Sequence, residues 1–314
     1  MPTFTATHPA TQRQTAFGLM ALAIGIGSFS FTLVKVALRE LSPAGLACGR
    51  VVSSAVVFAI VVAPPHRRRP VLPEHRARVL LCGFGGSAVF HLLFAWGQQR
   101  VSVAIAAITM ATFPVIVAAG EVVFLQHRLQ PRQVAGLVLT TAGCGAIGLA
   151  GGSSPGGSMW GAAAIAAATL VWAGVTVATR SIVTVYDPWW LNAPGTFLGA
   201  ALMLVVEAPH VGEFGSLSLE GWLAVVWLGS ASSAFVYYVM ARLMTVVSAT
   251  AASSMGTVVT PTSVFVAWVV LGDRPTLLEA VGGVIVIAGV VLVTRRERAS
   301  SGAASARERD LQAG

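Results

Sequence analysis

Hydrophobic residues in this chain gather in long runs that short polar breaks separate. The clearest example is segment 260–296, in which an apolar run, the break GDRPT and a second apolar run closed by two arginines follow one another. Each run approaches the roughly 20 residues that an α-helix needs to cross the ~30 Å hydrocarbon core of a bilayer. The pattern predicts an all-α integral membrane protein with ten transmembrane helices. The predicted spans are 16–38, 43–62, 79–97, 102–125, 133–149, 159–179, 188–206, 221–241, 247–271 and 277–293.

The last hairpin has an earlier counterpart in segment 113–151, which indicates an internal duplication. Segment 78–150 aligns with 222–294 at an offset of about 146 residues. The matched positions are Pro114 with Pro261, Gly136 with Gly282, and Gly143 with Gly289. Because each copy holds five helices, an odd number, the second copy enters the membrane from the opposite side. The duplication therefore predicts two inverted five-helix repeats, as in many secondary transporters.

The polar breaks divide the chain into five segments. We expect a cytoplasmic N-terminal segment (1–15), a first repeat (16–150), a periplasmic or extracellular linker (151–157), a second repeat (158–294) and a disordered cytoplasmic tail (295–314). With both termini inside, 15 of the 20 Lys and Arg residues lie in cytoplasmic segments, as the positive-inside rule requires. This predicts a multi-pass protein of the plasma membrane with both termini cytoplasmic.

Composition supports the membrane assignment and excludes several classes. The chain is 55% hydrophobic and only 10% charged, whereas soluble domains carry roughly 25% charged residues. The net charge of +8 does not indicate nucleic acid, because the arginines lie between and after the apolar runs. Cys48, Cys82 and Cys144 show no pairing or zinc-site spacing, so we expect no disulfide, metal or cofactor.

Three motifs together resemble the EamA-type branch of the drug/metabolite transporter superfamily. They are Ser-Pro-x(6)-Arg (Ser42, Pro43, Arg50), the hairpins that begin at Pro114 and Pro261, and the Gly-x(6)-Gly helices. The resemblance covers residues 16–294 and implies ten helices that move small metabolites, with export more common and a proton gradient as the drive. The family usually has Glu before the Arg-Leu that ends the fourth helix. Here His127 stands in the first repeat and Asp273 in the second.

Ionisable side chains inside the spans are functional candidates, because charge is costly in hydrocarbon. Arg50 and His91 are candidates for substrate binding, and His91 and Glu121 for proton coupling. The family motif includes the arginine, whereas the family has an apolar residue at the position of Glu121. Each also has a structural alternative: a snorkelling Arg50, a packing His91 and an ion pair of Glu121 with Arg128.

Aromatic residues and prolines supply the remaining candidates. Trp96, Trp172, Tyr237 and Tyr238 could line a substrate cavity, where aromatic faces stack on planar or cationic groups. Helix packing or a membrane-interface position is the alternative for each. Pro114 and Pro261 each remove a backbone donor and bend their helices. They are candidate hinges for alternating access or fixed bends in a cavity wall.

The leading hypothesis is a secondary active transporter, and more specifically an exporter, of a small metabolite such as an amino acid or aromatic compound. Its expected partners are this substrate, the lipid bilayer and protons, and one chain suffices because it holds both repeats. The alternatives are an intramembrane enzyme acting on a lipid and a non-transporting receptor. No Walker loop or H-E-x-x-H motif is present in the sequence, so we expect no enzyme activity.

Overall fold

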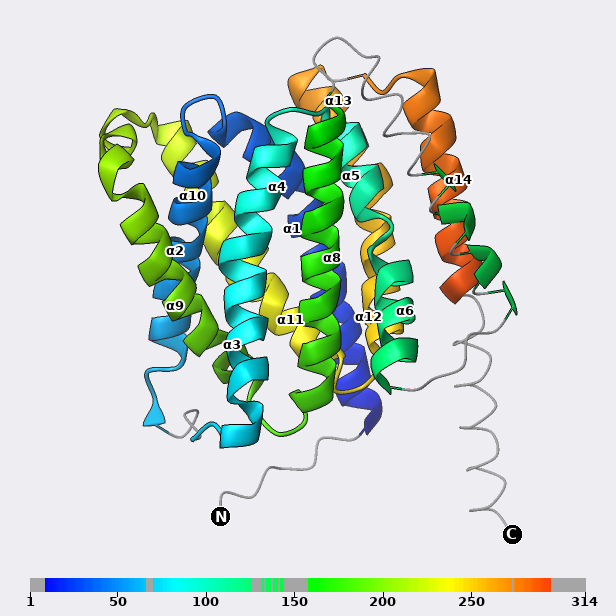
Figure 1. The fold of residues 1–314 in the computed structure, drawn as a ribbon, viewed down its shortest axis with the longest axis horizontal. Helices are drawn as coiled ribbons and strands as arrows, with labels where there is room; N and C mark the ends of the chain where they lie inside the picture. Colours follow the sequence, from blue (N-terminus) through cyan, green and yellow to red (C-terminus); the bar gives the residue numbers. More distant parts are fainter. Residues whose placement is uncertain are drawn as a thin grey trace.

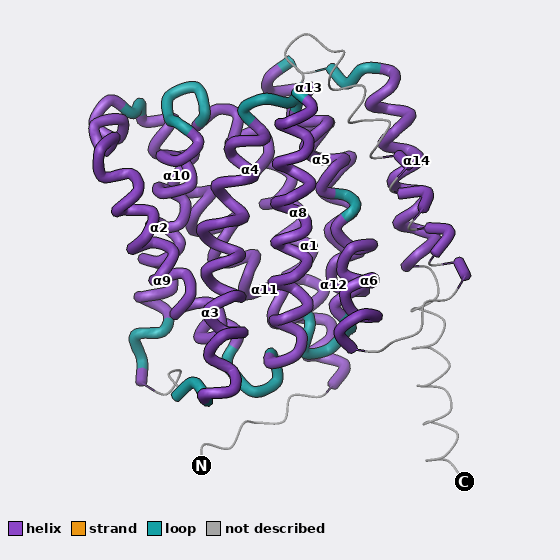
Figure 2. The backbone as a smooth tube through the Cα atoms, viewed as in Figure 1, coloured by secondary structure: helices purple, strands orange, loops and turns teal. Residues whose placement is uncertain are grey.

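The structure is a computed structural model that describes most of the chain. The described residues are 9–65, 70–125, 131–132, 134–136, 138–140, 142–143, 158–272 and 274–294. His127, Arg128, Cys144, Asp273, the linker 151–157 and the tail 295–314 lie outside them. The described residues form helices joined by short loops (Figure 2).

The helices fall into two sets, here called the first half (residues 9–143) and the second half (residues 158–294). The first half contains α1 (Pro9–Ala37), α2 (Pro43–Val61), η2 (Pro73–His75), α3 (Arg76–Phe84), η3 (Gly85–Val89), α4 (Phe90–Gln98), α5 (Val103–Met110) and α6 (Phe113–Leu125). The second half contains α8 (Met159–Ile182), α9 (Pro188–Glu207), η4 (Ala208–Ser216), α10 (Leu219–Gly229), η5 (Ser230–Phe235), α11 (Val236–Leu243), α12 (Ala249–Met255), η6 (Gly256–Val258), α13 (Val259–Leu271) and α14 (Leu277–Thr294).

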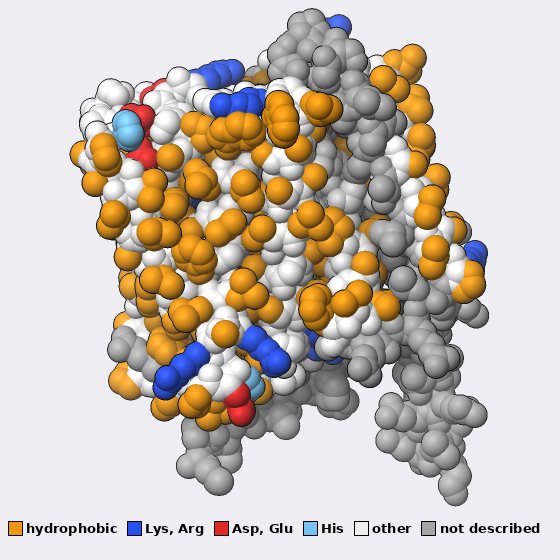
Figure 3. Space-filling model, viewed as in Figure 1, with side chains coloured by type: hydrophobic (Ala, Val, Ile, Leu, Met, Phe, Trp, Pro, Cys, Tyr) orange, Lys and Arg blue, Asp and Glu red, His pale blue; other side chains and the backbone are white. Residues whose placement is uncertain are grey.

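The molecule is a multi-pass membrane protein. Within the described residues, seven helical stretches are long and apolar enough to cross a bilayer, and Val259–Leu271 and Leu277–Gly289 are shorter apolar helices. Over α3, α4, α8 and α9 the surface is apolar between two ends that carry the charged side chains (Figure 3). Such an apolar surface is stable against lipid and not against water.

Corresponding helices of the two halves run in opposite directions. In Figure 1, α1 begins at the lower face of the molecule and α8 begins at the upper face. The packing is reciprocal, because α1 packs on α13 and α8 packs on α6, while α5 packs on α13 and α12 on α6. Hydrogen bonds cross between the halves, for example from Ser30 Oγ to Ser232 Oγ at 2.6 Å. Neither half therefore forms a separate bundle.

Four predicted spans contain interruptions that the apolar pattern did not predict. The third span passes from α3 through the π-helical turn η3 into α4, and the eighth passes from α10 through the π-helical turn η5 into α11. The fourth span breaks between α5 and α6, and the ninth passes through the 3₁₀ turn η6 before α13. Pro114 and Pro261 lie in the first turns of α6 and α13, where a helix tolerates a residue without an N–H group. The interruptions are matched between the halves.

The predicted boundaries shifted at two further places. α1 begins at Pro9 rather than near residue 16, so helical structure extends into the predicted N-terminal segment. The expected loop 207–220 contains the 3₁₀ helix η4. Glu40 ties the end of this region to the upper end of α1, because its carboxylate accepts from Ser218 N at 2.7 Å and Ser218 Oγ at 2.6 Å. These two hydrogen bonds lower the pKa of Glu40.

The matched glycines lie in one contact between the halves. A Cβ on Gly289 would lie 2.8 Å from the carbonyl oxygen of Gly136, and one on Gly143 would lie 3.2 Å from that of Gly282. Helices associate closely in a membrane where small residues let their backbones approach. The Gly-x(6)-Gly spacing therefore marks the faces that bring α14 against Gly136, Thr140 and Gly143.

Replacing Gly289 by leucine should destabilise the protein. The side chain would collide with backbone atoms of Gly136 and Thr140, and overpacking of this kind costs about 1–3 kcal/mol. The measurement is thermal unfolding of the purified protein in detergent. Gly174→Leu is the matched control, because a Cβ there meets nothing within 4 Å. Equal unfolding temperatures for the two variants would contradict the proposed contact.

A carboxylate from each half contacts the start of a short helix of the other half. Glu121 of α6 accepts from the N–H groups of Ala249 (3.2 Å) and Thr250 (3.3 Å) and from the Thr250 hydroxyl, at the start of α12. Glu279 of α14 accepts from the hydroxyl of Ser102, at the start of α5, at 2.9 Å. The first helical N–H groups have no partner within a helix, and negative charge there is favourable. The two contacts lie at opposite faces of the molecule (Figure 1).

Candidate functional site

Four polar side chains meet between the two halves. We call Arg50, His91, Ser233 and Tyr237 the central cluster. Ser233 Oγ lies 3.3 Å from Arg50 Nη2 and 3.0 Å from His91 Nε2. Tyr237 OH also lies 3.0 Å from His91 Nε2. Each residue is six or more positions from the nearest end of its span, about 9 Å at 1.5 Å per residue. The cluster is therefore deep within the apolar part of the molecule.

The two π-helical turns position this cluster. In η5, Ser233 donates to the carbonyl oxygen of Leu228, five residues earlier, at 2.8 Å. In η3, the carbonyl oxygen of Gly86 accepts from Tyr237 OH at 2.5 Å. A π-helical turn widens the helix and changes the direction of the following side chains, and such turns recur at functional sites. His91 follows η3 and Tyr237 follows η5, so each turn directs one half of the cluster.

A glycine brings the backbones of the two halves together beside Arg50. A Cβ on Gly229 would lie 2.6 Å from the carbonyl oxygen of Arg50 and 3.2 Å from Ser54 N. Only a residue without a side chain permits this approach of α10 to α2. The contact places Arg50 within reach of Ser233 on the adjoining turn.

Arg50 is buried without a compensating carboxylate. It is 5% exposed, and His91 is 1% exposed. Within the described residues, the ion pair present is His75 with Glu74, at 3.9 Å, so no described carboxylate pairs with Arg50. A buried charge is stable only when it is paired or extensively hydrogen-bonded. The arginine thus carries a charge that the described part of the protein leaves uncompensated.

An aromatic wall adjoins the cluster. The ring of Trp172 lies 4.7 Å from that of Tyr237, 5.4 Å from that of Phe90 and 6.3 Å from that of Phe113. These rings come from both halves. Stacked or tilted aromatic rings at these separations form a stable apolar surface that also attracts cations.

The predicted site residues separate into two groups. Arg50, His91, Trp172 and Tyr237 come together, although they lie on four helices far apart in sequence. Tyr238 instead stacks on Trp189, with ring centres 4.4 Å apart. Trp96 is at the surface, 37% exposed, with the guanidinium of Arg100 3.9 Å above its ring.

Glu121 also lies apart from the cluster, since both of its oxygens accept hydrogen bonds from the start of α12. Ser233, Gly86 and Gly229 were absent from the predicted site. The glycine pair before His91 and the run GSASS before Tyr237 were the available sequence signals, because small residues cluster where helices deviate or approach closely.

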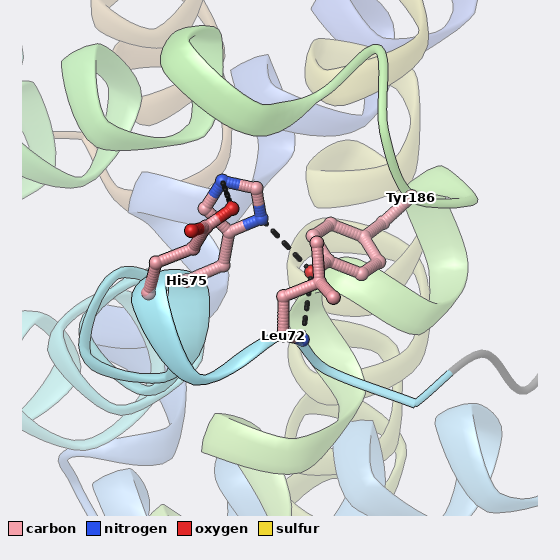
Figure 4. A network of polar contacts seen from close by, with 4 residues as sticks. Leu72, His75 and Tyr186 are labelled. Carbon is pink, nitrogen blue, oxygen red and sulfur yellow. Dashed lines mark hydrogen bonds and ion pairs between the residues drawn. The ribbon is translucent and has the colours of Figure 1, made fainter.

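A second buried tyrosine shows a contrasting arrangement. Tyr186 OH lies 2.9 Å from His75 Nδ1 and accepts from Leu72 N at 3.1 Å (Figure 4). This contact joins the segment before α3 to the segment between α8 and α9. His75 Nε2 also faces Glu74, so both ring nitrogens of His75 have a polar partner in the protein. The contact is complete in itself, unlike the surroundings of Arg50.

Replacing Ser233 by alanine should destabilise the protein. The change removes the acceptor of Arg50 Nη2 and one acceptor of His91 Nε2, and an unsatisfied buried polar group costs about 1–3 kcal/mol. The measurement is thermal unfolding in detergent. Ser181→Ala is the control, because Ser181 is exposed and bonds only within its own helix. An unchanged unfolding temperature in S233A would contradict the hydrogen-bonding role of Ser233.

The model of one protein family matches both halves of the chain. The EamA-like transporter family matches at residues 15–149 and 159–295. A "Probable terminal-alkyne amino-acid exporter" from Streptantibioticus cattleyicolor is 30% identical over 286 residues, which is 88% of this chain and 92% of that protein. The uncharacterized transporter YdfC from Bacillus subtilis is 25% identical over 86% of this chain and 88% of that protein.

Solved structures are similar in fold. One crystal structure superposes with a TM-score of 0.65 over 91% of this chain and 98% of that chain, at 20% sequence identity. At this identity the likeness bears on the fold alone. The comparisons agree with the expectation of two related transporter domains in one polypeptide.

Proposed function

Because the chain belongs to the EamA-like transporter family, a family of transporters and not of enzymes, we propose that it exports a small amino acid or aromatic metabolite. The observation that carries this proposal is the uncompensated Arg50, buried in a cluster that both halves build. Amino acids bring a carboxylate to such a group. The similarity to an amino-acid exporter supports the same substrate class and direction.

We propose that transport proceeds by alternating access between two inverted five-helix repeats, ten transmembrane helices in all. The opposite directions of α1 and α8 support this arrangement, as do the matched interruptions of the fourth and ninth spans. Interrupted helices at a repeat interface are typical of secondary transporters. Pro114 and Pro261 would act as hinges, since they lie where these spans change direction.

We propose that the protein lies in the plasma membrane with both termini cytoplasmic, which makes the lower face in Figure 1 the cytoplasmic one. The start of α3 and the ends of α8 and α11, which carry Arg76, Arg78, Arg180 and Arg242, lie at the lower face, whereas α10 begins at the upper face with Glu220 in its first turn. This distribution follows the positive-inside rule.

A proton gradient is the proposed driving force, with His91 as the coupling group. Histidine changes charge within the physiological pH range. We prefer it to Glu121, because both oxygens of Glu121 are occupied in capping α12. His91 also contacts Arg50's partner Ser233, so its charge is coupled to the anion-binding group.

Transport should be lost in Arg50→Gln. The purified protein in liposomes is expected to give counterflow of at least one amino acid from a panel of aliphatic and aromatic members. R50Q should lower that counterflow at least about tenfold, since a hydrogen bond to a charged group contributes about 1.5–3 kcal/mol. Arg100→Gln is the control, because Arg100 is at the surface. No counterflow of any amino acid by the wild type would contradict the proposed function.

Glu121→Gln should leave proton-driven transport intact. The amide oxygen can still accept at the start of α12, but the side chain can no longer carry a proton. We expect the same dependence of uptake on an imposed pH gradient as in the wild type, with stability lower by about 1 kcal/mol. Loss of gradient-driven uptake with counterflow retained would instead assign proton coupling to Glu121.

A further inference from the structure

The hydrogen bonds of the central cluster determine which nitrogen of His91 carries its proton. A carbonyl oxygen only accepts, so Ser233 must donate its hydroxyl proton to Leu228 O, and Tyr237 must donate its own to Gly86 O. Both hydroxyl oxygens are then acceptors towards His91 Nε2. The Nε2 atom therefore bears the hydrogen, and Nδ1 of the neutral ring bears a free lone pair.

Two fully buried atoms of the central cluster have no hydrogen-bond partner, and one of them is a donor and the other an acceptor. Arg50 Nε is a donor without an acceptor, and His91 Nδ1 is an acceptor without a donor. Ser54 Oγ, one helical turn after Arg50 on α2, is also sealed and without a partner. Buried polar atoms are nearly always hydrogen-bonded in proteins, so unpartnered ones call for an explanation. A donor and an acceptor left open on two side chains that share Ser233 Oγ fit a ligand that brings one group of each kind.

We propose that the central cluster binds an α-amino acid as its zwitterion, with the carboxylate on Arg50 Nε and the ammonium group donating to His91 Nδ1. This inference rests on the proposed function and specifies the substrate chemistry of that site. Arg50 and His91 both contact Ser233 Oγ, so the two open atoms belong to adjoining groups, as the two charged groups on one α-carbon require. The rings of Trp172 and Phe90 adjoin the cluster and would face the amino-acid side chain.

The same geometry makes a proton and the substrate mutually exclusive. His91 Nδ1 has one lone pair, which accepts either a proton from water or a hydrogen bond from the ammonium group. A proton on Nδ1 also converts the ring to a cation beside Arg50, which repels a second cation. Among the described residues, the titratable groups with a hydrogen bond to this histidine or to Ser233 are Arg50 from α2 and Tyr237 from α11. Helix α5 has no ionisable residue, and Arg180 of α8 bonds to Met244 O at the lower face.

Because a proton and the substrate compete for His91 Nδ1, the two must cross the membrane in opposite directions, which is antiport. One proton binds Nδ1 on one side of the membrane and leaves it to water on the other, and one zwitterion moves in the opposite direction. The zwitterion has no net charge, so each cycle moves one positive charge with the proton. The exchange needs no further reactant.

The test compares three ligands that share a side chain. L-norvaline, pentanoate and butylamine form one set, and L-phenylalanine, 3-phenylpropanoate and 2-phenylethylamine form the other. Binding to the full chain in nanodiscs is measured by calorimetry between pH 5 and pH 8. At pH 8 each analogue that lacks one charged group should bind at least about tenfold more weakly than its amino acid, because a buried partner stays unpaired. Amino-acid affinity should fall as the pH is lowered and His91 takes up its proton.

Two variants test whether His91 recognises the ammonium group and Arg50 the carboxylate. His91→Gln should abolish the pH dependence and the preference for the amino acid over the deaminated acid, while the preference over the amine persists. Arg50→Gln should abolish the preference over the amine. His75→Gln and Arg100→Gln are matched controls that should change neither preference, since both residues lie outside the cluster.

A third measurement does not depend on the folding of any variant. Wild-type proteoliposomes on a supported membrane should give a transient current with the amino acid, because one charge moves per cycle. Electroneutral transport, or pH dependence that persists in His91→Gln, would overturn the inference while leaving the proposed function intact. Absence of amino-acid counterflow would overturn the proposed function itself.

Discussion

Burying an arginine among apolar helices is the constraint on which the arrangement of the middle of this molecule depends. Hydrocarbon offers no hydrogen bonds, so each polar group must find its partner within the protein or in a ligand. Arg50 obtains one from Ser233, and Ser233 is available only because η5 turns it across towards the other half. His91 bonds to the same hydroxyl, and Tyr237 bonds to His91 and to the Gly86 carbonyl in the matching turn η3. The two π-helical turns therefore supply the hydrogen-bond partners that the buried charge of Arg50 and its neighbours need.

The periodicity of the chain predicted the larger features, because length and hydrophobicity directly determine what can span a bilayer. The hairpin duplication located the glycine faces and the matched proline positions, and the family model matches the chain twice, at residues 15–149 and 159–295. Four of the six proposed substrate-binding residues converge on one site, since ionisable and aromatic residues within spans are few. The choice among them could not be predicted: adjacent tyrosines on one helix point to different neighbours, Tyr237 to His91 and Tyr238 to Trp189.

The π-helical turns could not be predicted from composition, because a single added residue per turn leaves the hydrophobicity of the span unchanged. Gly85 and Gly86 permit one such turn, and Ser233 stabilises the other through its bond to the carbonyl five residues earlier. Glu121 was a reasonable candidate for charge chemistry on its position in a span. Its role as a cap depends on α12, a short helix 128 residues away in sequence, and only the fold brings the two together.

The reciprocal caps have a consequence for how the chain must be assembled. Glu121 completes the start of a helix in the second half, and Glu279 reaches the serine that starts a helix in the first. A half made alone would keep the serine that caps its own short helix, Ser102 or Ser248, but would lack the carboxylate that the other half supplies. The contact of Glu279 with Ser102 can form only after the last hairpin has been made, so the packing of the early helices is completed last.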